Sequence, residues 1–294
     1  MKEEHAIVLK GVEKRIDNFT LGPIHLTIPK ECITAIVGPN GSGKSTLFRI
    51  LMNLQQLDRG EMTILNRTYP ADDIALKERI GYMPGTYEMI IDALSGQQAI
   101  NYIKSFYRRW NEQEYERLLK RFQVDVGQKL HKMSKGMLQR FSFIQTLAAS
   151  PELLLLDEPS SGLDPLAWSD MMEEIHAFVE QPERTVVIAT HSIEEVRRLA
   201  DYVVFMHKGK TLGFYEKDRL FADWKEVWLD HEVPRERLAV VAGVVDIDGE
   251  QAKRLITNDM STTAAELERL GIKVYRTFPV AFDEIMKIKL RSKL

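Results

Sequence analysis

The sequence has no apolar run long enough to cross a membrane. Its longest apolar segments, LLLLDE at 153–158 and LAVVAGVV at 238–245, are far shorter than the roughly 18 residues that a spanning helix needs. The N-terminal segment MKEEHAIVLK also lacks the apolar core of a secretory signal. If a membrane is involved, we therefore expect another chain to span it.

Cysteine is nearly absent, and neither sign of charge is in large excess. The single cysteine, Cys32, cannot form an intrachain disulfide, and its place beside an apolar run predicts a buried, unreactive thiol. This fits a reducing compartment. The 40 basic and 43 acidic residues give a net charge of −3, which provides no reason to expect nucleic acid as a partner. The 294 residues suffice for one large or two modest domains, and they contain no repeat or low-complexity segment.

A glycine-rich loop, GPNGSGKST, is the most informative segment that is present. It follows the apolar run ITAIV at 33–37, which predicts a buried strand, and precedes LFRILMNL at 47–54, which has helical spacing. Glycines let the backbone wrap around a polyphosphate, and the helix N-terminus adds partial positive charge. Lys44 would neutralise the outer phosphates and Ser45 would bind Mg²⁺, so the loop predicts nucleoside triphosphate binding. The loop residues are Gly38, Pro39, Asn40, Gly41, Ser42, Gly43, Lys44, Ser45 and Thr46.

Two further strand ends carry polar residues suited to the same chemistry. The run LLLLDE predicts a buried strand that ends at Asp157, a metal ligand in phosphate-loop enzymes, followed by Glu158 as a general base. By itself this pattern also fits a buried strand that meets a solvated loop. TVVIATHS at 185–192 predicts another strand, and its His191 lies at the carboxyl end, where open α/β sheets bind their ligands. We expect His191 to contact a phosphate.

The segment MSKGMLQR at 133–140 completes a pattern that resembles the ABC ATPases. It lies between the phosphate loop and LLLLDE, where that family carries its signature motif, and Ser134 and Gly136 match the motif. Lys135 and Met137 are typical of cassettes that serve ABC-2-type exporters. The segments FTLGPIHLTI at 19–28 and GYMPGTYEM at 81–89 resemble cassettes of Ytr-like and antibiotic-efflux systems. The resemblance covers about residues 5–220.

The resemblance implies a complete reaction scheme. Its cofactors are ATP and Mg²⁺, with Asp157 holding the metal through the second shell, Glu158 as the catalytic carboxylate and His191 at the γ-phosphate. Ser134 and Gly136 would complete the nucleotide site of the opposite subunit. It also implies a homodimer or heterodimer of cassettes on the cytoplasmic face of the cell membrane, attached through a polytopic membrane subunit. Asp164, in SSGLDP, would lie at the dimer interface.

Two positions depart from the family pattern. The family usually has a Gln directly after Pro84, but this chain has Gly85, which predicts slower hydrolysis or a different coupling geometry. Glu88 in the same loop would substitute for that Gln, or would simply be solvated. Many cassettes also stack an aromatic residue on the adenine, where this chain has Ile16. Phe19 would then reach the base, or would instead belong to the core of its strand.

The fold class that follows is α/β, a phosphate-loop NTPase with a parallel-sheet core, an antiparallel layer and a helical subdomain. We expect the ATPase domain to span 1–217, with its helical subdomain at about 92–149, and a small α+β appendage to span 218–294. In the appendage, LAVVAGVV predicts a strand, TTAAELERLG at 262–271 a helix and IKVYRTF at 272–278 a strand. An aromatic stripe in the helical subdomain predicts packing within that subdomain or, alternatively, a groove for a partner. Its members are Tyr102, Phe106, Tyr107 and Trp110.

Two other functions stay open at this point. A soluble ABC machine that acts on ribosomes or nucleic acid would use the same site, although a single cassette without sustained heptads argues against it. A regulatory cassette with weak hydrolysis would fit Gly85, although the intact Glu158 and His191 argue for a working enzyme.

Overall fold

The computed structural model describes residues 5–69, 71–85 and 93–291 of the chain. It divides into two compact units, Met1–Gly213 and Phe214–Leu294, which are treated separately below. Within the described ranges, none of the helices combines the length and apolarity that crossing a bilayer would require.

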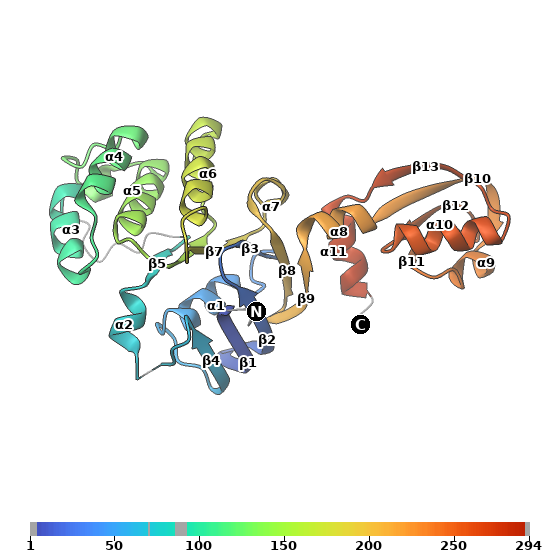
Figure 1. Ribbon diagram of the computed structural model, residues 1–294, viewed down its shortest axis with the longest axis horizontal. Coiled ribbons are helices and arrows are strands. Elements are labelled where there is room, and N and C mark those ends of the chain that lie inside the picture. The colour runs from blue at the N-terminus through green and yellow to red at the C-terminus, as the bar shows by residue number, and fades with distance from the viewer. Residues whose placement is uncertain (1–4, 70, 86–92, 292–294) are drawn as a thin grey trace. The chain divides into compact units, whose positions relative to one another are not determined.

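The first unit is built on a six-stranded sheet (Figure 1). The pairs β5–β6, β6–β7, β7–β3 and β3–β8 are all parallel, so these strands end at the same edge of the sheet. Every residue of β3, β6 and β7 is buried, as expected for strands with both faces covered. In sheet order the strands are β5 (Ile80–Met83), β6 (Leu153–Asp157), β7 (Thr185–Thr190), β3 (Ile33–Val37), β8 (Tyr202–His207) and β9 (Lys210–Glu216).

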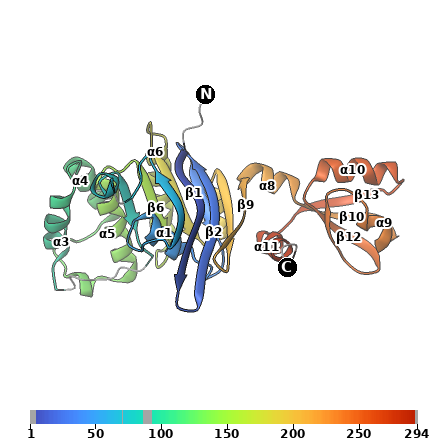
Figure 2. The ribbon, with the colours of Figure 1, turned by 90° about the horizontal axis from the view of Figure 1, so that it is seen from below.

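An antiparallel layer covers one face of this sheet. Its order is β2-β1-β4, and helix α1 packs between the layer and the parallel sheet (Figure 2). Leu47 and Phe48 of α1 share one buried cluster with Ile7 of β1 and Val187 of β7. The phosphate loop is therefore anchored on both sides. The elements are β1 (His5–Ile16), β2 (Phe19–Pro29), α1 (Lys44–Leu51), β4 (Arg59–Ile64) and α2 (Asp73–Lys77).

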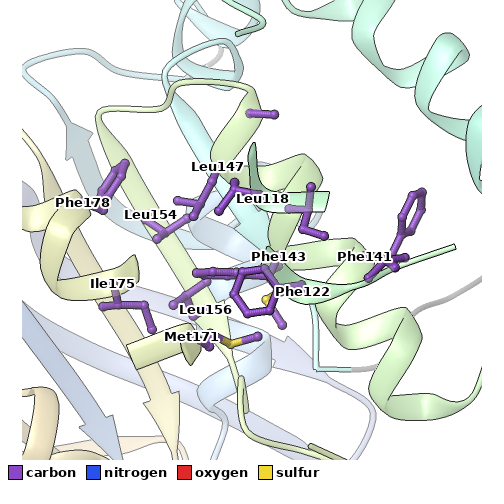
Figure 3. Close-up of a cluster of buried hydrophobic side chains, with 14 of the residues drawn as sticks. Leu118, Phe122, Phe141, Phe143, Leu147, Leu154, Leu156, Met171, Ile175 and Phe178 are labelled. Atoms are coloured by element: carbon purple, nitrogen blue, oxygen red, sulfur yellow. The ribbon is translucent and has the colours of Figure 1, made fainter. Parts of the chain in front are cut away.

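A helical subdomain lies between β5 and β6 in the chain and packs on the opposite side of the sheet. Its buried side chains join those of β6 and α6 in one cluster, in which Phe122 and Phe143 meet edge to face (Figure 3). Ser95, Asn111 and Ser134 cap its three α-helices through their side chains, which explains where those helices begin. The elements are α3 (Gly96–Ile103), η1 (Lys104–Phe106), α4 (Glu112–Phe122), η2 (Leu130–Lys132) and α5 (Lys135–Ala148), followed after β6 by α6 (Pro165–Val179) and after β7 by α7 (Ile193–Leu199).

The aromatic stripe of this subdomain is divided between core and surface. Burial raises the pKa of Tyr107, and Trp110 packs against Tyr115 with a ring separation of 5.5 Å. Tyr102 and Phe106 contact each other edge to face but remain 58% and 60% exposed. The prediction that the whole stripe packs within the subdomain is therefore wrong for this pair, because helix α3 and the 3₁₀ turn after it turn those two side chains outward.

The second unit is a small α+β domain. Its antiparallel sheet has the order β11-β12-β10-β13, and residues of α9 and α10 share a buried cluster with β10, β11 and β12. The segment LAVVAGVV is not one strand, because Leu238 and Ala239 end a helix and only Val244 and Val245 enter β11, after a turn at Gly243 with a φ of 83°. The elements are α8 (Lys217–Asp223), β10 (Lys225–Pro234), α9 (Arg235–Ala239), β11 (Val244–Ile247), β12 (Gln251–Thr257), α10 (Met260–Arg269), β13 (Val274–Pro279) and α11 (Phe282–Arg291).

A buried carboxylate ties the helical subdomain to the rest of the first unit. Glu174 of α6 is almost fully buried, and Arg117 of α4 binds both of its oxygens, at 2.8 Å and 2.6 Å. Arg121 donates a further bond of 2.5 Å. Burial by itself would raise the pKa of Glu174, but the two guanidinium groups outweigh it and hold that pKa below its usual value.

Replacing Glu174 by Gln should therefore destabilise the unit, because it removes the buried carboxylate that Arg117 and Arg121 share. We expect the free energy of unfolding to fall by about 1–3 kcal/mol at pH 7, measured by urea denaturation. Since the pKa of Glu174 is lowered in the folded protein, its contribution is present at neutral pH and is lost in acid. The difference from wild type should shrink below about pH 4. Glu173→Gln, an exposed neighbour that also binds Arg121, should change stability by less than about 0.5 kcal/mol; equal effects of the two changes would contradict this prediction.

Candidate functional site

The phosphate loop lies between β3 and α1, and its lysine already has partners. Lys44 is only 5% exposed, and its Nζ donates to the carbonyl oxygen of Gly38 at 2.8 Å. Nζ also lies 3.4 Å from Oε1 of Glu158. Gly43 directly precedes the helix with a φ of 105°, a conformation that glycine adopts without strain. Ser45 and Thr46 occupy the first turn of the helix, whereas Pro39, Asn40 and Gly41 are exposed at the outer side of the loop.

Neighbouring elements approach the loop closely. A Cβ atom added to Gly38 would lie 2.1 Å from the carbonyl oxygen of Met206, and the amide of Gly209 donates to the carbonyl oxygen of Ser42. The ring of Phe19 comes within 2.9 Å of where a Cβ atom of Gly43 would be. Phe19 is half-buried against the cluster around α1, so it borders the loop and packs at the edge of the core at once.

Asp157 ends β6 beside the start of α1 and has the properties of a metal ligand. The carboxylate is buried, which raises its pKa, and a hydrogen bond with the Ser45 hydroxyl offsets part of that effect. Its Oδ1 atom is buried without a hydrogen-bond partner. A hydroxyl and an unsatisfied carboxylate oxygen suit Mg²⁺, which prefers oxygen ligands and takes few of them from protein. In the described ranges, no cluster of three or more His, Cys, Asp or Glu side chains forms a separate metal site.

Glu158 and His191 are brought together from adjacent strands. Nδ1 of His191 lies 2.7 Å from Oε2 of Glu158, while the other oxygen of Glu158 faces Lys44. Glu158 has a φ of 49°, and its amide donates to the carbonyl oxygen of Ala189 in β7 at 2.8 Å. This bond ties the end of β6 to the end of β7, directly before the histidine. One carboxylate therefore contacts two cationic or proton-carrying groups from different elements.

The loop that follows Glu158 is held from the signature helix α5. The amide of Gln139 donates to the carbonyl oxygens of Glu158 and Pro159, at 3.1 Å and 3.2 Å. Nζ of Lys135 donates to the hydroxyl of Ser161 at 2.7 Å. A Cβ atom added to Gly136 would lie 2.6 Å from the carbonyl oxygen of Gly162, so only glycine allows this approach. Gln139 and Lys135 were not among the predicted site residues, because the sequence does not show that α5 touches this loop.

The predicted contacts of Ser134, Gly136 and Asp164 with a second subunit are not tested by a single chain. Within this chain, the Ser134 hydroxyl accepts from the Met137 amide and caps α5. Asp164 caps α6 by accepting from the amides of Leu166 and Ala167, and these bonds lower its pKa. Ser134 and Gly136 thus lie at the start of the signature helix, and Asp164 lies at the start of α6. They are separate from the group formed by Lys44, Ser45, Asp157, Glu158 and His191.

Gly85 lies against the predicted metal ligand. A Cβ atom added there would be 3.1 Å from the carbonyl oxygen and 3.4 Å from Cγ of Asp157. The position therefore belongs to the site, and the chain places no side chain there. Glu88, the other candidate in this loop, lies outside the described residues.

Comparisons with known proteins find relatives among ATP-binding proteins of ABC transporters and of drug resistance. A family model described as "ABC transporter" matches residues 21–161. The chain is 30% identical over 224 residues to the daunorubicin resistance ATP-binding protein DrrA3 of Streptomyces coeruleorubidus, covering 74% of this chain and 70% of that protein. It is 24% identical over 290 residues to the ABC transporter ATP-binding protein YtrB of Bacillus subtilis, covering 98% and 99%.

Two further comparisons bear on coverage and fold. The ABC transporter ATP-binding protein sll0415 of Synechocystis is 32% identical over 200 residues, which are 66% of this chain but only 55% of that protein. A solved ATP-binding subunit of an ABC transporter matches with a TM-score of 0.67 at 23% identity, covering 74% of this chain and 92% of that one. The predicted α/β phosphate-loop fold is thereby confirmed.

Replacing Gly85 by Gln should raise the rate of ATP hydrolysis several-fold, because it adds an amide beside Asp157 where the metal and the attacking water would bind. Steady-state phosphate release at saturating ATP measures this rate. Gly85→Ala is the matched control, since it introduces the same Cβ contact with Asp157 without an amide. Equal turnover of the two variants would show that the missing amide is not what limits the reaction.

Proposed function

Because this chain belongs to the ABC transporter family of ATP-binding proteins, we propose that it hydrolyses ATP at a site shared between two cassettes and thereby drives a separate membrane subunit. The observation that carries the proposal is the group formed by Lys44, Asp157, Glu158 and His191. These residues come from the carboxyl ends of three neighbouring parallel strands and supply phosphate-binding, metal-binding and proton-accepting groups in one place.

The contacts of Glu158 suggest how binding prepares hydrolysis. Its carboxylate is engaged by Lys44 on one side and by His191 on the other. The γ-phosphate of ATP would compete for both partners, because it carries more negative charge and more acceptor oxygens. Glu158 would then be released toward the water that attacks the phosphorus in line. Ser45 and Asp157 would hold Mg²⁺, which neutralises charge that develops on the phosphates.

We place the second half of the nucleotide site on another cassette. Ser134 caps α5 and is exposed, so the helix N-terminus and this hydroxyl are available to the γ-phosphate bound in a partner. Asp164 would lie at the same interface. Homodimer and heterodimer both satisfy this arrangement. ATP bound between the cassettes would favour their closed association, and hydrolysis would weaken it.

We further propose that the transporter is an ABC-2-type exporter. The support is the signature MSKGMLQR and the similarity to YtrB and to DrrA3, a daunorubicin resistance protein. In this arrangement, residues 1–217 form the ATPase domain, and its helical subdomain at about 92–149 docks on the membrane subunit. The exposed pair Tyr102 and Phe106 gives that subdomain an apolar contact point. The cassette would thus be peripheral, on the cytoplasmic face of the membrane. The appendage at 218–294 receives no chemical role.

One of the two alternative functions is supported by a specific observation. A regulatory cassette with weak hydrolysis fits Gly85, which brings no amide to the site. A soluble machine that acts on ribosomes or nucleic acid has no support among these relatives, whose names are those of transporter and drug-resistance proteins.

Glu158→Gln should trap a stable ATP-bound dimer, because binding stays intact while water activation is lost. Light scattering coupled to size exclusion, at saturating ATP, should show a mass of about twice 33.9 kDa. Adding Lys44→Ala to the same variant should restore the monomer, since that change removes the main phosphate contact. A monomer at saturating ATP for Glu158→Gln alone would rule out the homodimer and indicate a different cassette as the partner.

Capture of the tagged chain from detergent-solubilised native membranes should co-purify a polytopic membrane protein in stoichiometric amount. Quantitative mass spectrometry identifies it, and Tyr102→Ser together with Phe106→Ser should reduce its recovery. Recovery of the chain with ribosomes or nucleic acid, and without a membrane protein, would contradict the transporter proposal.

A further inference from the structure

A second carboxylate, Glu195, is buried close to Glu158 and His191. It lies in the first turn of α7 and is 2% exposed. In the part of the chain that the structure describes, no Lys, Arg or His forms an ion pair with it. Glutamate is rarely buried in this way unless it is paired, so the position requires an explanation.

The hydrogen-bond partner of Glu195 is a hydroxyl group on the loop that carries Glu158. Its Oε1 atom is hydrogen-bonded to the hydroxyl of Ser160, two residues after Glu158. Its Oε2 atom is buried without a hydrogen-bond partner among the described residues, and the nearby hydroxyl of Thr190, directly before His191, acts to lower its pKa. Thr190 in turn accepts from the amide of Ser192 at 2.9 Å. Glu195 therefore links the loop after β6 to α7, the helix that begins two residues after His191.

We propose that Glu195 is a positioning residue that keeps Glu158 and His191 in contact by tying Ser160, in the loop after Glu158, to α7, the helix that follows His191. This rests on the proposed ATP hydrolysis, and it adds a residue to which the motifs assign no role. Burial raises the pKa of Glu195, although both hydroxyls act against that shift. The hydrogen bond from Ser160 offsets part of the cost of burying this carboxyl. We therefore expect the bond to persist and to hold the loop after Glu158 against α7.

The alternative is that Glu195 merely supports the start of α7. That role is already filled, because the hydroxyl of Ser192 caps the helix by accepting from the amide of Glu195. The capping bond uses the backbone of residue 195 and does not need its carboxyl. The carboxyl of Glu195 is therefore available to bind Ser160 in the loop after Glu158. Substitutions at residue 195 separate this role from support of the helix.

Glu195→Ala should lower kcat for ATP hydrolysis by about 10- to 100-fold and change KM for ATP by less than about threefold, because misplacement of the catalytic pair leaves the phosphate loop intact. Glu195→Gln keeps an acceptor oxygen for the hydroxyls and should stay within about threefold of wild-type kcat. Glu194→Ala, in the same turn but exposed, is the matched control and should change neither constant. Thermal melting of each variant checks folding.

Ser160→Ala tests the connection from the other side. It should lower kcat in the same direction, and adding it to Glu195→Ala should cost no further activity, since one contact is then removed twice. Should Glu195→Ala fail to fold, Ser160→Ala and Glu195→Gln still provide the test. An unchanged kcat for Ser160→Ala, or an equal loss for Glu195→Gln and Glu195→Ala, would overturn the proposal.

A nucleotide-free measurement separates failure of this proposal from failure of the proposed function. The ring resonances of His191, assigned with His191→Gln, should shift in Glu195→Ala and in Ser160→Ala but not in Glu194→Ala. If the wild type hydrolyses no ATP, the proposed function fails while the resonances still test the contact. If the wild type is active and the His191 resonances are the same in all variants, Glu195 does not position the pair.

Discussion

The parallel pairing of β6, β7 and β3 is the constraint on which the rest of the first unit depends. Because these strands are paired in parallel, their carboxyl ends open at one edge of the sheet, and every chemical group of the site lies there. The strands are buried at all positions, which requires the antiparallel layer with α1 on one face and the helical subdomain with α6 on the other. The common direction of the strands thus determines at which edge of the sheet the site lies, and the layers on the two faces bury the strands that carry it.

The charged side chains at that edge contact one another. Lys44 faces Glu158, Glu158 faces His191, and the neighbouring Asp157 is buried with one oxygen unsatisfied. The two carboxylates have different neighbours, since Asp157 is directed toward Ser45 at the start of α1 and Glu158 toward Lys44 and His191. Around them, α5 and α7 hold the loop at 158–164 through side chains that take no direct part in the chemistry.

The residues that the structure brings together at this edge can be picked out from the sequence, because each lies in a pattern that is encoded locally. A glycine-rich loop, a carboxylate at a strand end and a histidine at the next strand end are recognisable without knowing what packs on them, and the phosphate loop with its strand and helix followed directly. The secondary structure of the appendage was predicted less well. LAVVAGVV has the composition of a strand, but its first two residues belong to α9 and its last two to β11, with a turn at Gly243 between them. The contacts of Lys135, Gln139, Glu174 and Glu195 could not be predicted, since charged and polar side chains are ordinarily solvated, and only the fold shows which of them it buries.

In the proposed site, the carboxylate of Glu158 would also compete with any anion that enters the phosphate loop. An incoming anion would have to displace the Glu158 carboxylate from Lys44 and from His191. Its binding free energy would then be only the difference between the contacts it makes and those it replaces. A free phosphate or a monophosphate exchanges one anionic group for another and gains little. A triphosphate engages the whole row of loop amides as well, so its gain is far larger. In the proposed site, the contacts of Glu158 with Lys44 and His191 would therefore favour triphosphates over smaller phosphorylated solutes.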